Sequence, residues 1–346
     1  MLIHGARMTS STSTMDRPRR CGILLLLAIS VLVPSQVASQ QAPQDTTESS
    51  DAYAAPRATA PVLADHRFTS TSFILSPFIR TRFGNSLGIG SSSGLELPPV
   101  VIGGNEYRFE TGELLFATLD VEYQHAVKEW LGVSAGFRLV GRLGTETSSL
   151  LYQGVTVASG FQLGWLMRVW QSDDMLLSSS IRLANTSYTV VDLVGFIQGI
   201  VDDVPTSENK LMVSGPLTIG QTGLHYAWAA SQLIGVTAAA NIGYGDSPDR
   251  QRGSEWYADM GGIVDFDLRD KLSAPLGVAV GGRWTSVPDF GESFEGNVKA
   301  LVARFDYIGR PDFNLGVEIT SQWQGVRNVD ESLRFTTATM DFRYYF

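Results

Sequence analysis

Apolar and polar residues alternate along most of the chain from residue 70 to the C-terminus. In residues 314–323, one parity holds Leu315, Val317 and Ile319, and the other parity holds polar residues or glycine. Because successive side chains of a β-strand point to opposite faces, this pattern predicts strands with one apolar face and one polar face. The same alternation recurs in the closing segment of the chain.

We predict about twelve strands. They lie near residues 70–82, 112–124, 131–143, 158–171, 175–186, 217–229, 233–245, 256–269, 275–287, 296–308, 312–324 and 333–346. Short turns alternate with longer, polar loops that are rich in Gly and Asp. Every predicted strand exceeds the mean of about 5–6 residues in soluble proteins. The expected fold is all-β, a transmembrane antiparallel up-and-down β-barrel of about twelve strands with both termini in the periplasm.

The alternation alone does not say which face of the strands meets water. A secreted sandwich or a lipocalin-like barrel has the same periodicity, with its apolar face turned inward. The length of the strands favours the membrane barrel, and so do the aromatic residues that gather near predicted strand ends. These aromatic residues are Tyr123, Trp130, Trp165, Trp170, Trp228, Trp256, Trp284, Trp323 and Tyr344.

The chain ends on "MDFRYYF", a strand with aromatic residues at Phe342, Tyr344 and Phe346. This ending resembles the C-terminal signal of bacterial outer-membrane proteins. The resemblance implies an outer-membrane location in contact with lipid, and recognition by the barrel-assembly machinery through these three residues. It identifies a class of protein and no subfamily.

The N-terminus carries the pattern of a secretory signal peptide. Arg17, Arg19 and Arg20 precede the apolar run "GILLLLAISVLV", and small residues follow it. This run is shorter than the roughly 20 residues that span a bilayer. We therefore expect cleavage after Ser39, and a retained anchor is the alternative.

Three parts of the chain are expected from these patterns. They are a signal peptide over residues 1–39, a flexible periplasmic lead-in over residues 40–66 and an outer-membrane barrel over residues 67–346. The lead-in is predicted from its Ala, Pro, Gln, Thr and Ser content. The one cysteine of the chain, Cys21, falls within the expected leader.

The parity of Phe346 assigns a face of each strand to the barrel interior. If Phe346 faces lipid, the residues of the opposite parity line the lumen, where charges avoid the cost of about 2–4 kcal/mol for Arg at the midplane of the lipid face. The lumen residues predicted in this way are Arg80, Arg82, Asp120, Glu122, Arg138, Arg142, Arg168, Arg182, His225, Asp265, Asp267, Arg283, Arg304, Asp306, Glu318, Asp341 and Arg343. They form either a polar pathway for solutes or a network of ion pairs that fills and stabilises the barrel.

One segment breaks the alternation. In residues 187–216, apolar residues recur at helical spacing, and Pro205 ends the run. This spacing predicts a short helix near residues 190–204. The alternatives are an extension of the preceding strand and a helix on the membrane surface.

The composition limits the partners and the chemistry. The formal net charge of −9 gives a nucleic-acid partner no electrostatic support. We expect no zinc site, because the chain has no close pair of histidines and its one cysteine falls in the leader. The acidic loops do not match the spacing of a calcium loop, so we predict no metal and no cofactor.

Three functions fit this architecture. The first is a narrow channel or uptake pore for small solutes of unidentified chemistry, and the second is a non-transporting barrel that acts structurally or binds partners through its loops. The third is a membrane-embedded hydrolase, which needs a base such as His225, the one histidine within a predicted strand. Because the sequence shows no partner for it, we expect His225 to be a hydrogen-bonding lumen residue and the protein to be no enzyme.

Overall fold

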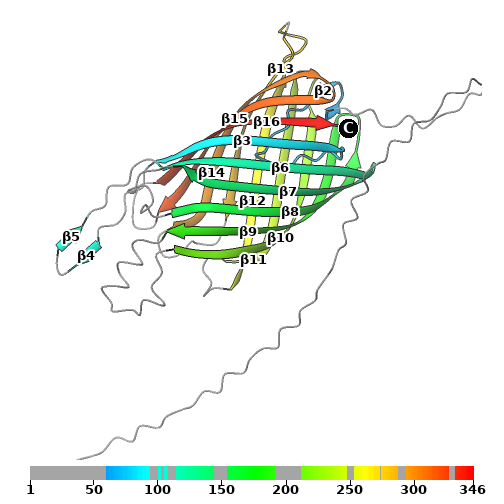
Figure 1. The fold of residues 1–346 in the computed structure, drawn as a ribbon. Helices are drawn as coiled ribbons and strands as arrows, with labels where there is room; N and C mark the ends of the chain where they lie inside the picture. Colours follow the sequence, from blue (N-terminus) through cyan, green and yellow to red (C-terminus); the bar gives the residue numbers. More distant parts are fainter. Residues whose placement is uncertain are drawn as a thin grey trace, which may run out of the picture. The chain divides into compact units, whose positions relative to one another are not determined.

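Antiparallel strands close on themselves into a barrel (Figure 1). Among the described residues, twelve strands take part, and each pairs with the next barrel strand along the chain. They are β3 (Arg82–Ser93), β6 (Leu114–Lys128), β7 (Leu131–Leu143), β8 (Gly154–Gln171), β9 (Met175–Val191), β10 (Met212–Ala229), β11 (Ile234–Asp246), β12 (Ser254–Asp267), β13 (Leu276–Ser286), β14 (Phe294–Arg310), β15 (Phe313–Val326) and β16 (Ser332–Tyr345). The last strand closes the barrel on the first, with Tyr345 opposite Arg82. This confirms the predicted all-β, up-and-down barrel.

The structure is a computed structural model. It describes residues 60–93, 100–102, 105–107, 114–143, 154–191, 212–247, 253–272, 274–286, 294–326 and 332–346, all within one unit, Ala54–Phe346. The predicted signal peptide and the predicted lead-in up to residue 59 lie outside the described residues and stay predictions. Within the described residues, no helix is long and apolar enough to cross a membrane.

The two ends of the barrel differ. Short connections between the strands gather at one end, which we call the turn end, and the remaining connections lie at the opposite loop end. The turns occupy residues 129–130, 172–174, 230–233, 268–275 and 311–312. The C-terminus also lies at the turn end, where the backbone N–H of Phe346 donates to the carbonyl of Thr81 at 3.0 Å. One loop-end connection contains the small hairpin of β4 (Val100–Ile102) and β5 (Asn105–Tyr107).

The outer surface of the barrel is apolar and its interior is polar. In β14, Phe305 is 59% exposed, whereas its neighbours Arg304 and Asp306 are each 1% exposed. A soluble barrel would show the reverse arrangement. Large exposed apolar side chains continue around the barrel, for example Leu87, Ile89, Leu163, Ile181, Leu224, Val317 and Met340. An apolar exterior of this extent decides between the two alternatives in favour of a membrane-spanning barrel.

The strand predicted over residues 70–82 is wrong. Residues 71–81 form no strand, and the first barrel strand is β3, over Arg82–Ser93. After Arg82, the inward positions of β3 hold only glycine or serine, so its alternation is weak in the sequence. Residues 70–81 looked like a strand because their apolar residues also pack, but they pack inside the barrel.

Residues 60–81 lie within the lumen, and we call them the inner segment. The segment begins with a hairpin of β1 (Val62–Leu63) and β2 (His66–Arg67), turned by Ala64 and Asp65 at positive φ. This hairpin lies near the end of the barrel where β16 ends (Figure 1). It is fixed to the turns, because Ala60 donates its N–H to the carbonyl of Pro311 at 2.6 Å. The described part of the predicted lead-in, residues 60–66, is thus a folded hairpin.

The segment between β9 and β10 is described only at its two ends. Residues 187–191 belong to β9, and residues 212–216 belong to β10. The helix predicted near residues 190–204 is therefore wrong for its first two residues, since Val190 and Val191 continue the ladder of β9. The rest of that predicted helix lies outside the described residues.

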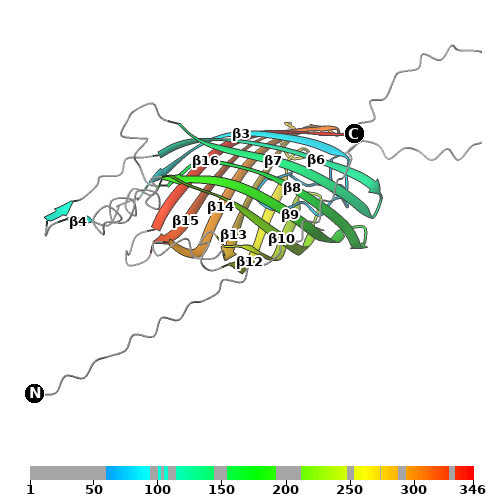
Figure 2. The ribbon, with the colours of Figure 1, turned by 60° about the horizontal axis from the view of Figure 1, so that its bottom comes forward.

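The tilt of the strands around the lumen is visible in Figure 2.

Candidate functional site

The inner segment packs its apolar residues against small residues of the barrel wall. Phe73 and Ile74 form one buried cluster with Ala239, Ala279 and Ala300. Small wall residues leave room inside the barrel for the larger side chains of the segment. Burying each of these large side chains contributes roughly 1.5–3 kcal/mol.

A second apolar cluster lies nearer to the turn end. It joins Leu63, Phe68 and Phe78 of the inner segment to Ala227 and Ala229 of β10. Phe68 and Phe78 contact each other with ring centroids 5.1 Å apart. The second cluster also includes Leu176 of β9, so the two clusters hold the segment against β9 to β14 on one side of the lumen.

Glu318 of β15 anchors the middle of the inner segment. Its carboxylate accepts hydrogen bonds from the hydroxyls of Thr71 at 2.7 Å and Ser72 at 2.6 Å, and from the N–H of Ser72 at 3.3 Å. Arg304 also contacts this carboxylate, at 3.3 Å. A buried carboxylate is costly unless its oxygens are bonded, and here both oxygens have partners.

His66 anchors the hairpin at the turn end. Its Nε2 lies 2.6 Å from Oδ1 of Asp265, and its Nδ1 lies 3.0 Å from the carbonyl of Gln232. Both ring nitrogens therefore face oxygen acceptors. Each of the two contacts needs one proton. Both are hydrogen bonds when both ring nitrogens are protonated, or when Asp265 carries the proton of its contact with Nε2.

The neighbouring residue Arg67 adds further bonds. Its backbone N–H donates to Asp267 at 3.1 Å, and its guanidinium donates to Asn314 at 2.9 Å. The same guanidinium donates to the carbonyls of Ile308 and Arg310. Burial lowers the pKa of Arg67 below its ordinary value, with Arg269 as the next cause. Even so, this arginine stays charged at neutral pH.

A compact ionic network fills the lumen beside the inner segment. Arg304 contacts Asp306 at 2.6 Å and also contacts Asp341, and Arg343 contacts Asp341 at 3.1 Å. These side chains are almost fully buried. Buried charges require such pairing, so this part of the lumen follows the ion-pair interpretation.

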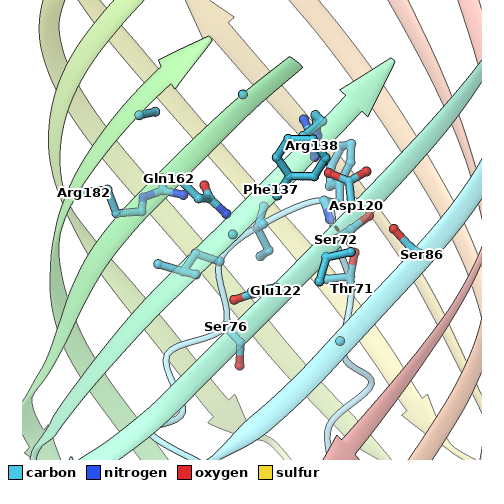
Figure 3. A pocket seen from close by; sticks show the side chains of 18 of the residues that line it. Thr71, Ser72, Ser76, Ser86, Asp120, Glu122, Phe137, Arg138, Gln162 and Arg182 are labelled. Atoms are coloured by element: carbon cyan, nitrogen blue, oxygen red, sulfur yellow. Dashed lines mark hydrogen bonds and ion pairs between the residues drawn. The ribbon is translucent and has the colours of Figure 1, made fainter. Parts of the chain in front are cut away.

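A cavity of about 290 Å³ lies inside the barrel beside the inner segment (Figure 3). It is lined by residues 71–76 of the inner segment and by strands β3, β6 to β13 and β16. Figure 3 shows Asp120, Glu122, Arg138, Gln162 and Arg182 around it. This volume is just below the range of ~300–1,000 Å³ for ligand pockets.

Four ion pairs line the cavity. Arg82 contacts Glu122 at 2.8 Å, and Arg283 contacts Asp259 at 2.5 Å. The other two pairs are Arg138 with Asp120, and Arg343 with Asp341. The fifth arginine of the lining is Arg182.

The structure places most of the predicted lumen residues in two regions. Those that line the cavity are Arg82, Asp120, Glu122, Arg138, Arg182, Arg283, Asp341 and Arg343. The buried residues beside the inner segment are His225, Asp265, Asp267, Arg304, Asp306 and Glu318.

Three predicted lumen residues lie elsewhere. Arg80 is part of the inner segment instead of a barrel strand. Arg168 lies towards the turn end, where it donates to Gln171 at 2.6 Å. Arg142 is half-buried in β7, towards the loop end.

The three aromatic residues of the predicted assembly signal lie together in and after β16. Phe346 is 64% exposed, Tyr344 is also exposed, and Phe342 is half-buried. The rings of Phe342 and Tyr344 lie 6.4 Å apart. Their recognition by assembly machinery stays a prediction.

Several site residues were not predicted from the sequence. Asp259 has the same parity in β12 as Asp265, so the alternation contained the signal for it. Thr71 and Ser72 gave no signal, because their partner Glu318 follows more than 240 residues later.

Ser180 and His225 form an unpredicted pair. The hydroxyl of Ser180 lies 2.7 Å from Nε2 of His225, and both side chains are buried. Within the described residues, Nδ1 of His225 has no side-chain partner. Among all the residues that the structure describes, no group of three or more side chains could hold a metal ion.

No protein-family model and no curated protein matches this chain. Among solved structures, the chain is similar to the NanC porin, with 9% identity, a TM-score of 0.46, and coverage of 75% of this chain and 98% of the porin. It is also similar to the translocator domain of the autotransporter NalP from Neisseria meningitidis (12% identity, TM-score 0.44, 78% and 90% covered). A third is an outer membrane channel from Pseudomonas putida F1 (10% identity, TM-score 0.43, 81% and 100% covered).

Proposed function

We propose that this protein is an outer-membrane channel for small polar solutes, and that its inner segment closes the lumen. One observation carries the proposal. A cavity lined by charged and polar side chains lies inside the barrel, and residues 71–76 of the inner segment form part of its lining. A polar lumen suits solutes that cannot cross lipid, and the segment is placed where it would block them.

The attachment of the inner segment supports a closure that opens. Within the described residues, no backbone–backbone hydrogen bond joins residues 69–80 to the barrel wall. The middle of the segment is held instead by side chains, such as those of Thr71, Ser72 and Ser178. Such hydrogen bonds contribute about 0.5–1.5 kcal/mol each. The segment can therefore leave the wall without breaking the sheet of the barrel.

The non-transporting barrel is the second candidate. The two apolar clusters and the buried contact between His66 and Asp265 favour it, because both are costly to break. In that case the inner segment is a permanent filling, and the function resides in the loops.

We propose no catalytic role for the pair of Ser180 and His225. A serine nucleophile needs a base that a third group orients, and it needs access to substrate. Both side chains are buried, and Ser178 next to them bonds to the inner segment at Pro77. The unmodified protein and the Ser180→Ala variant should both hydrolyse an activated ester no faster than the detergent blank. Hydrolysis by the unmodified protein that the variant abolishes would contradict this assignment.

Single-channel recording tests the proposed function. The processed protein, refolded into a planar bilayer, should give stepwise currents that grow with salt concentration. Its heat-dependent gel mobility confirms in parallel that the barrel has folded. A folded protein that stays silent over the whole voltage range would overturn the channel and support the filled barrel.

A further inference from the structure

Arg182 of β9 differs from every other charged residue that lines the cavity. The lining contains five arginines and four carboxylates, and each carboxylate contacts an arginine other than Arg182. Asp259 and Glu122 act on Arg182 electrostatically, but they are bound to Arg283 and Arg82. Within the described residues, Arg182 has no hydrogen bond or ion pair, and its Nε is buried without a partner. A guanidinium in a confined space is costly without a counter-charge.

Two glycines of the wall make room for Arg182 and for its neighbour Gln162. Gly164 of β8 pairs directly with Arg182, and a Cβ there would lie 3.1 Å from Cγ of Arg182. Gly136 of β7 pairs with Gln162, and a Cβ there would lie 2.7 Å from the side-chain nitrogen of Gln162. Both side chains therefore run across their neighbouring strands, and Figure 3 shows them next to each other at the cavity.

We propose that Arg182 and Gln162 form a binding site for a small organic monocarboxylate inside the lumen. A guanidinium presents its N–H groups as a planar fork that matches the two oxygens of a carboxylate. The amide N–H₂ of Gln162 offers a further donor to the same group. The lining has an excess of one positive charge, which one carboxylate neutralises, and the cavity of about 290 Å³ limits the ligand to a small molecule. This site deepens the proposed function, on which it rests for its role in transport.

Trifluoroacetate is a suitable probe, because its ¹⁹F signal broadens when it binds to a large particle. The full processed protein in a zwitterionic detergent should broaden the signal saturably, and acetate should compete. The substitution Arg182→Gln should weaken this binding at least tenfold. Arg310→Gln is the matched control, since it removes an arginine that pairs with Asp312 at the turn end, outside the cavity. Its binding should equal that of the unmodified protein.

Three results would overturn the site. They are equal broadening by the Arg182→Gln variant, an equal loss in the Arg310→Gln variant, and broadening that does not saturate. Arg182→Lys keeps the charge and should retain binding within a few-fold, which guards against a folding defect in the glutamine variant. The binding is measured in detergent and needs no current. Silent bilayers with Arg182-dependent binding would therefore refute the channel alone, and currents without such binding would refute the site alone.

Discussion

The ring of His66 lies 2.6 Å from the carboxylate of Asp265, although 199 residues separate them in the chain. His66 belongs to the inner segment, and Asp265 belongs to the barrel wall near the turn end. This contact therefore fixes the N-terminal part of the described chain inside the barrel. It also places a hydrogen bond between two ionisable groups where neither reaches water, since both side chains are almost fully buried.

Replacing His66 with leucine should loosen the inner segment. Removing one partner of a buried charged pair costs about 3–5 kcal/mol, because the other charge is left without compensation. Trypsin should then cleave after Arg67 faster in the variant than in the unmodified protein. His125→Leu is the control, because His125 lies on the exposed side of the wall. Equal cleavage rates in the two variants would contradict the role of His66 as an anchor.

The close approach of β11 to the hairpin gives a second prediction. A Cβ added at Gly235 would overlap the ring of His66, whereas a Cβ added at Gly141 meets nothing within 4 Å. Gly235→Ala should therefore displace the hairpin and speed tryptic cleavage after Arg67. Gly141→Ala should change neither the cleavage nor the thermal stability. If the Gly235 variant kept its hairpin protected, the packing described for β11 and His66 would be incorrect.

Buried and exposed ion pairs should differ in their contribution to stability. Glu318 bonds Thr71, Ser72 and Arg304 in the interior, and Glu318→Gln should destabilise the barrel by about 3–5 kcal/mol because the arginine loses a buried partner. Asp312→Asn breaks an exposed pair with Arg310, which contributes about 0–1 kcal/mol. The temperature at which the folded gel band disappears should fall clearly for the first variant only. Similar shifts for both variants would contradict the larger contribution of the buried ion pairs to stability.

The apolar exterior predicts a defect in membrane insertion. Phe305 points outward between Arg304 and Asp306, so Phe305→Arg places a charge in lipid at a cost of about 2–4 kcal/mol near the midplane. The folded fraction recovered in lipid vesicles should drop sharply, whereas Phe305→Leu should fold like the unmodified protein. Normal folding of the arginine variant would mean that this face does not meet lipid.

Alternation in the sequence predicted the strands and the side chains that share a face, whereas the strand lengths and the aromatic residues were needed to predict which face meets lipid. It gave both bounds of β7, residues 131 and 143, and it placed Arg304 and Asp306 inside with Phe305 outside. This works because side-chain direction in a strand depends only on parity.

The inner segment was not predicted, because its signal looks like that of a strand. Phe73, Ile74 and Phe78 are apolar because they are buried, as wall residues are, but their partners are alanines and larger apolar residues of distant strands. The lone position of Arg182 was hidden as well. Pairing across the lumen depends on strand register and on the path of the inner segment, and neither can be read from one strand alone.

Locking the inner segment to the wall tests the central claim most directly. A Cβ at Gly277 would lie 2.9 Å from Cγ2 of Thr69, so cysteines at these two positions are close enough for a disulfide. The processed protein has no other thiol, since Cys21 falls in the predicted leader. We predict that the Thr69→Cys, Gly277→Cys barrel conducts at least tenfold less when oxidised than after reduction, whereas the Thr69→Cys control is indifferent to reductant. Equal currents before and after reduction, with the disulfide verified by mass, would show that the inner segment does not close the lumen.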